Sequence, residues 1–134
     1  MVTSTTQTVD IAQALAAILE TVPGVRSYWA PLDTVRPPTA GGAAVIGQPD
    51  IDFADSSSGF CNATWTFGVT LVTSRNDPAS AMRVMSQLLL DVVAALDVDV
   101  PGIFSIEPLD ARPIPVLVNG VELPGYTLSI RIRA

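Results

Sequence analysis

The stretch FCNATWTFGVTLVTSRNDPASAMRVMSQLLLDVVAAL, residues 60–96, decides the fold of this chain. In its first part, small or apolar residues occupy every second position, and mostly polar residues lie between them. The apolar positions are Cys61, Ala63, Trp65, Phe67, Val69 and Leu71. This alternation predicts a long β-strand that has one buried face and one polar face.

The second part of the same stretch predicts a helix over about 78–96. Asp77 is a favourable N-cap residue, and Pro78 suits the first helical position because its missing N–H would be unbonded there. Apolar residues then recur at helical spacing, at Met82, Met85, Leu89, Val92 and Leu96. We expect this stripe to pack against the buried face of the preceding strand.

Two shorter elements precede the long strand. Asp10 and Gln13 resemble a capping box, and a helical stripe follows at Ile11, Leu15, Ile18 and Val22. Pro23-Gly24 is expected to end this helix. The apolar run over 43–46 predicts a strand, and a polar loop is expected over 47–59.

The C-terminal third predicts further strands. The segments 103–109 and 111–118 are expected to be separate strands, and Pro113 and Pro115 favour an edge position. Asn119-Gly120 predicts a tight hairpin turn, whereas Pro124-Gly125 suggests a second turn or a bulge. The final strand, 126–133, alternates apolar and polar residues, and we expect it to be a second edge strand.

These elements predict one α+β domain over residues 1–134. It should contain a mainly antiparallel sheet of four or five strands. The N-terminal helix and the second long helix, about 78–96, should pack on one face of that sheet.

The composition favours association with other subunits. Hydrophobic residues make up 49% of the chain, charged residues only 15%, and the mean hydropathy is +0.43. So much apolar surface with so few charges predicts that part of it is buried between subunits. No apolar run approaches the roughly 18 residues needed to cross a bilayer, so we expect no membrane partner.

The charge balance argues against a surface that grips nucleic acid. There are 13 acidic residues against 7 arginines, with no lysine or histidine, and the net charge is −6. Binding to phosphate backbones relies on clustered lysine and arginine. An acidic surface would instead repel DNA and let it slide past.

A search for catalytic or ligand-binding patterns finds none that is specific. Cys61 lies on the apolar side of the long strand and has no histidine partner for nucleophilic catalysis. Asp50, Asp52 and Asp55 form an acidic cluster, which could in principle hold calcium but lacks the EF-hand pattern. We therefore expect no enzyme activity, no cofactor and no metal.

Seven residues are candidates for contact with another subunit or partner. Tyr28 and Trp29 are expected in a proline-flanked loop, where they either cap the sheet or anchor an interface. Arg131 and Arg133 lie on the polar face of the last strand and could pair with acids of a neighbouring subunit. Asp50, Asp52 and Asp55 are the candidates in the polar loop.

The arrangement resembles the tail terminator proteins of long-tailed bacteriophages and related neck proteins. The matching features are the strand ATWTFGVTLVTSRND that runs into an Asp-Pro capped helix, and the closing strand PGYTLSIRIRA. The resemblance implies a homo-oligomeric, hexameric ring at the head-proximal end of the tail tube. Such a ring stops tube polymerisation and binds the tail tube protein and the head completion proteins. It implies a virion protein, present in the host cytoplasm during assembly, with DNA passing through the lumen without specific binding.

Other classes of function stay open on the sequence. One is another neck ring component, such as a stopper or connector protein, which would bind the portal-side ring instead of the tail tube. A small carboxylate-based enzyme would need converging acids in a cleft. A ligand-binding module is the remaining alternative.

Overall fold

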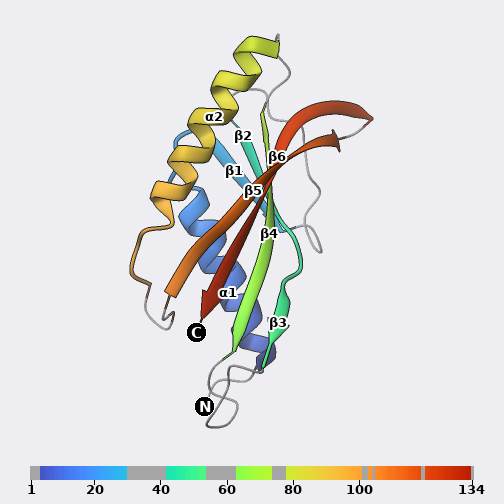
Figure 1. Ribbon diagram of the computed structural model, residues 1–134. Helices are drawn as coiled ribbons and strands as arrows, with labels where there is room; N and C mark the ends of the chain where they lie inside the picture. Colours follow the sequence, from blue (N-terminus) through green and yellow to red (C-terminus); the bar gives the residue numbers. More distant parts are fainter. Residues whose placement is uncertain are drawn as a thin grey trace.

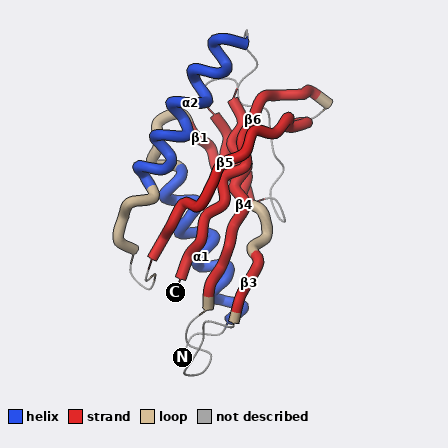
Figure 2. The backbone as a smooth tube through the Cα atoms, in the orientation of Figure 1, coloured by secondary structure: helices blue, strands red, loops and turns tan. Residues whose placement is uncertain are grey.

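The computed structural model has the α+β architecture expected from the sequence, and its described residues form two helices and a mostly antiparallel sheet of six strands (Figures 1 and 2). The structure describes residues 4–29, 42–53, 63–73, 78–100, 103, 105–118 and 120–133. The sheet has more strands than the four or five predicted, because short strands form in two segments that were expected to be loops.

The sheet is built around the long strand β4 (Thr64–Thr73). The strand order is β1-β2-β4-β6-β5, where β1 is Val25–Trp29, β2 is Gly42–Ile46, β6 is Val121–Arg133 and β5 is Ser105–Val118. Strand β1 runs parallel to β2, and the other pairs are antiparallel. Strand β2 pairs with residues 69–73 of β4, and β3 (Asp50–Asp52) pairs with residues 64–66 along the same edge of β4. The predicted polar loop over 47–59 therefore contains a strand, and its residues 54–59 lie outside the described part of the chain.

The two helices lie on the same side of the sheet (Figure 1). Helix α1 (Ser4–Leu19) begins six residues before the predicted capping residue Asp10, which is exposed within the helix. Its predicted stripe is buried. The helix ends at Leu19, before the predicted stop at Pro23-Gly24, so Val22 lies beyond it, and Gly24 has a φ of 80° in the turn that leads into the first strand. Helix α2 (Pro78–Ala95) begins with Pro78 as predicted; the expected cap Asp77 lies outside the described residues.

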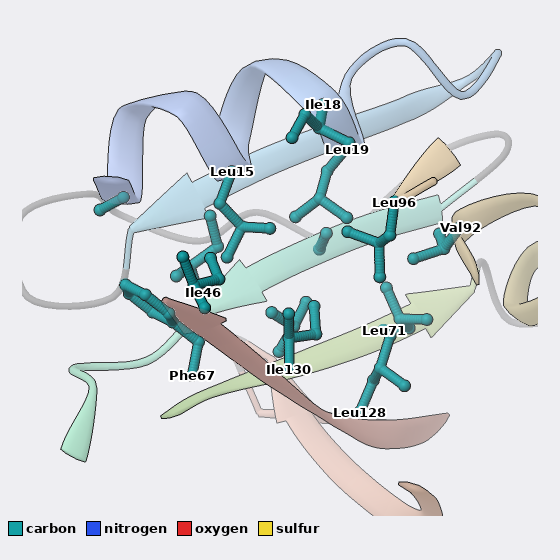
Figure 3. Packing of buried hydrophobic residues seen from close by; sticks show 14 of the residues in the cluster. Leu15, Ile18, Leu19, Ile46, Phe67, Leu71, Val92, Leu96, Leu128 and Ile130 are labelled. Atoms are coloured by element: carbon teal, nitrogen blue, oxygen red, sulfur yellow. The ribbon is translucent and has the colours of Figure 1, made fainter. Parts of the chain in front are cut away.

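The core fills the space between the helices and the sheet (Figure 3). Trp65, Phe67, Val69 and Leu71 are buried on the helix-covered face, as predicted. The neighbouring strand β6 (Val121–Arg133) adds Leu128, Ile130 and Ile132 to the same cluster. Ala63 is buried as expected, whereas Cys61 falls outside the described residues.

One part of the predicted stripe on α2 is wrong. Met85, Val92 and Leu96 are buried and Leu89 is partly buried, but the side chain of Met82 is 65% exposed. Leu88 is buried in its place. The buried arc of α2 is therefore rotated from the predicted one, because the sheet contacts residues on the Leu88 side of the helix.

Strand β5 (Ser105–Val118) is a single strand, not the two separate strands predicted over 103–109 and 111–118. Its register against β6 shifts between Pro108 and Asp110, which marks a bulge around Leu109. The strand lies at the edge of the sheet, as its prolines predicted. Val118 pairs with Val121 across a two-residue connection in which Gly120 has a φ of 79°, which fits the predicted tight hairpin turn.

Two predictions about β6 are wrong. Pro124 and Gly125 lie inside this continuous strand and form no second turn. β6 is also not an edge strand, because it pairs with β4 on one side and with β5 on the other. Gly125 is needed where it lies, since a Cβ at this position would be 2.7 Å from Cγ2 of Val116 and 2.8 Å from the carbonyl oxygen of Leu71.

The end of the β5–β6 hairpin extends beyond the rest of the sheet. The pairing of β6 with β4 stops at Gly125, so residues 115–118 and 121–124 pair only with each other. We call residues 115–124 the hairpin arm; its described part curves away at the upper right of Figure 1. One side of the arm packs on the sheet, where Val116 and Leu123 cluster with Val72.

Candidate assembly surfaces

The sheet face opposite the helices carries the polar positions of the long strands. On this polar face, residues paired across strands lie side by side, so the register defines rows. One row contains Asp50, Thr66, Arg131 and Glu107, and the next contains Asp52, Thr64, Arg133 and Ser105. With strands spaced about 4.8 Å apart, each aspartate is about 10 Å across the sheet from the arginine of its row. Four of the seven candidate residues are thus brought together by the fold.

Arg131 has its carboxylate partner within its own chain. Its Nη2 lies 3.0 Å from Oε2 of Glu107, directly across the β5–β6 pair. The two side chains are 35% and 44% exposed, so solvent screens the attraction. This ion pair makes Arg131 a cross-strand contact within the subunit, whereas the sequence suggested pairing with acids of a neighbouring subunit.

The other candidates on this face are more exposed. Arg133, Asp50 and Asp52 are exposed, and no ion pair involving Arg133 is found among the described residues. Asp55 lies outside the described part of the chain. Within that part, no group of three or more histidine, cysteine, aspartate or glutamate residues could hold a metal ion.

Tyr28 and Trp29 lie in strand β1, so the expectation of a loop was wrong. Trp29 pairs with the buried Ile46 and packs against the core, which agrees with a role in covering the sheet. Tyr28 pairs with Val45 and points to the opposite, polar face, where it is half-buried. The strand is tied to the end of α1 because the hydroxyl and N–H of Ser27 donate to the carboxylate of Glu20.

Sequence reasoning missed two apolar surfaces. The first, the outer stripe of α2, comprises Met82, Ser86, Leu90 and Val93; Met82 and Leu90 are 65% and 66% exposed. These residues are three or four positions apart and share one side of the helix. A second helical stripe was visible in the sequence, but it overlaps the core stripe through Met82.

The second surface is the outer side of the hairpin arm. Pro115 lies opposite Pro124, and Leu117 lies opposite Glu122, so the four side chains share one face. All four are exposed, Leu117 by 72%. The signal in the sequence is the alternation of Pro115 and Leu117, two apolar residues on one side of a strand.

The free edge of β5 is poorly suited to extend the sheet. The Gly47 N–H donates to the Gly68 carbonyl at 2.9 Å. The backbone N–H and C=O groups of even-numbered residues in β4 therefore point towards β2, and those of odd-numbered residues point towards β6. By the register of β4 with β6, the backbone groups of even-numbered β6 residues point towards β4 and not towards β5. The β5 residues paired with these even-numbered β6 residues therefore direct their own N–H groups outward, away from the sheet. Three of these residues are Pro108, Pro113 and Pro115, which have no N–H to donate. A neighbouring strand would therefore find gaps in the hydrogen-bond ladder.

No protein-family model matches the chain, and no curated protein matches it. Among the described residues, no helix is both long enough and apolar enough to cross a membrane.

Proposed function

We propose that this chain is a structural subunit of a phage virion, a tail terminator that forms a ring at the head-proximal end of the tail tube. In this role the ring stops polymerisation of the tube and offers the docking surface for head completion proteins. The chain acts by binding copies of itself and its neighbours in the virion.

The observation that carries the proposal is the apolar surface that the folded chain leaves uncovered. Large hydrophobic side chains are exposed on α2, on the hairpin arm and around β3, although the core between sheet and helices is already filled. These residues are Ile51, Phe53, Met82, Val84, Leu90, Val93 and Leu117. With only 15% charged residues to keep subunits apart, such surfaces favour assembly.

Two further features support this role. The α+β fold with a mainly antiparallel sheet is compatible with the resemblance to tail terminators. The net charge of −6, without lysine, suits a ring through which DNA slides without being held.

The first test is the native mass of the purified chain. We expect a closed assembly close to six protomers by native mass spectrometry, at concentrations where a control protein of similar size stays monomeric. A monomer at all concentrations would contradict the proposal.

The second test is genetic. In a long-tailed phage that encodes this chain, deletion of its coding sequence should give tails of uncontrolled length that do not join heads. Complementation with the wild-type chain should restore joined tails of normal length. Tails of normal length that fail only at head joining would assign the chain to the stopper side of the neck instead.

A further inference from the structure

We propose that the hairpin arm of one subunit docks on the outer stripe of α2 of the next subunit. The arm contributes Pro115, Leu117 and Pro124 around Glu122, and α2 contributes Met82 and Leu90 beside Arg83. This inference deepens the proposed ring and rests on it, because it names the contact by which one copy binds another.

The charges of the two surfaces are complementary. Arg83 precedes Leu90 by seven residues, so it lies two turns away along the same line of the helix. Glu122 lies directly opposite Leu117 on the arm. Each charge is exposed, and neither takes part in an ion pair among the described residues. Docking would place an unpaired arginine against an unpaired glutamate within an apolar contact.

The same charges argue against symmetric pairing of like surfaces. Two arms placed face to face would bring Glu122 against Glu122, and two α2 stripes would bring Arg83 against Arg83. Like charges at the centre of a contact disfavour it. The arm and the helix are different surfaces of one chain, so their contact is head-to-tail, which is the type that closes into rings.

The conformation of the arm is already restricted before docking. Its prolines have a fixed φ, and its inner side is held to the sheet by Val116 and Leu123 packed on Val72. Little conformational freedom is therefore lost when the outer side binds, which favours association. Since the outward N–H positions of β5 contain three prolines, the contact uses the side chains of the arm and not an extended ladder.

The test uses exposed positions, so that each subunit keeps its fold. Leu90→Asp damages the helix surface and Leu117→Asp damages the arm surface; Val98→Asp, at an exposed residue outside both surfaces, is the matched control. By sedimentation velocity, each of the first two variants should weaken self-association at least about tenfold, the effect of losing one central apolar contact. The control should assemble like the wild type, and all three should melt within a few degrees of it.

Mixing the two damaged variants distinguishes head-to-tail docking from other contacts. Leu90→Asp retains an intact arm and Leu117→Asp retains an intact helix, so the mixture should form a one-to-one dimer and nothing larger. A mixture that stays monomeric would overturn the proposal, as would variants that still assemble like the wild type.

A charge exchange tests the orientation. Arg83→Glu and Glu122→Arg should each weaken association, and the double variant should recover most of the loss. Failure of the double variant to recover would overturn the pairing.

The outcomes separate this inference from the proposed function. If the wild type forms a ring and Leu90→Asp and Leu117→Asp form the same ring, only the docking is overturned. If these variants form the ring but no longer bind the tail tube, the two surfaces are assigned to the tail tube protein. An assembly that depends on both surfaces, in a phage whose tails are normal without the chain, supports the docking and contradicts the terminator role. A wild-type chain that is monomeric overturns both.

Discussion

The indole Nε1 of Trp65 donates a hydrogen bond to the hydroxyl of Thr8 at 3.1 Å, which joins the central strand to the first helix across 57 residues of sequence. The side chain of Trp65 is 1% exposed, so its N–H has little access to water. Aromatic side chains of this size dominate the packing of a core, and a buried indole N–H needs a partner.

We predict that Thr8→Val destabilises the fold by about 1–3 kcal/mol, because it leaves the buried indole N–H without this acceptor. Valine has nearly the shape of threonine, so the change in packing is small. Thr8→Ser keeps the hydroxyl and is the control. Urea unfolding followed by tryptophan fluorescence measures both, and equal stability of the two variants would show that the hydrogen bond contributes little.

The two methionines of α2 should behave in opposite ways. Met85 is 3% exposed, so Met85→Ala should lower the free energy of unfolding by about 2–5 kcal/mol through lost burial and a cavity. Met82→Ala should change it by less than about 0.5 kcal/mol, because this side chain lies mainly in solvent. Thermal unfolding at low protein concentration, where assembly does not contribute, makes the comparison. Similar losses for both would mean that the helix is rotated towards the predicted stripe.

Gly125→Ala should destabilise the hairpin by about 1–3 kcal/mol. The new methyl group would overlap Val116 and the backbone oxygen of Leu71, which cannot move away without disturbing the sheet. Gly68→Ala is the matched control in the neighbouring strand, since no atom lies within 4 Å of its added Cβ. That variant should be as stable as the wild type or slightly more stable, because alanine restricts the unfolded chain. Chemical denaturation of the two variants side by side would reveal whether the close approach is real.

The ion pair between Arg131 and Glu107 should contribute about 0.2–1 kcal/mol, given its partial exposure. Arg131→Glu should lower the melting temperature, and adding Glu107→Arg should recover most of the loss at low salt. Arg133→Glu should leave the melting temperature nearly unchanged. If Arg131→Glu is equally harmless, the pair does not form in solution.

This ion pair affects the choice of variants that test whether Arg131 and Arg133 contact a neighbouring subunit. A chain in which both Arg131 and Arg133 are reversed would lose an internal contact as well as any contact with a neighbour. Arg133→Glu alone is the cleaner probe of the subunit boundary.

The prolines on the free edge of β5 should limit pairing between sheets. Replacing Pro113 and Pro115 by threonine restores two outward N–H groups on a strand that favours threonine. We expect the double variant to aggregate faster than the wild type, measured by light scattering on warming below the melting temperature. Threonine at Arg112, whose N–H faces β6, serves as the control. Equal aggregation of the double variant and the wild type would mean that the edge is protected by something other than its prolines.

Local patterns were sufficient to predict the elements that face the core. The alternation from Ala63 to Leu71 identified a strand and its buried side, and the helical spacing after Pro78 identified a helix and most of its buried residues, because the periods of strands and helices are set by backbone geometry. The prolines of β5 likewise predicted its edge position, because proline has no N–H to donate to a neighbouring strand.

What the sequence did not determine was how these elements are placed against each other. Met82 and Leu88 are both plausible core residues of α2, and only contact with the sheet decides which is buried. β6 became an interior strand because it pairs with β4, more than fifty residues earlier. The partner of Arg131 depends on the register of the hairpin, including the bulge near Leu109.

The candidate surfaces divide in the same way. The sequence alone determined that Asp50, Asp52, Arg131 and Arg133 are polar positions beside apolar ones, and that the chain is acidic and rich in apolar residues. Only the tertiary structure placed these four residues on one face and left the arm and the α2 stripe uncovered. The physical reason is that periodicity depends on neighbours along the chain, whereas strand pairing, helix rotation and exposure depend on contacts between distant segments.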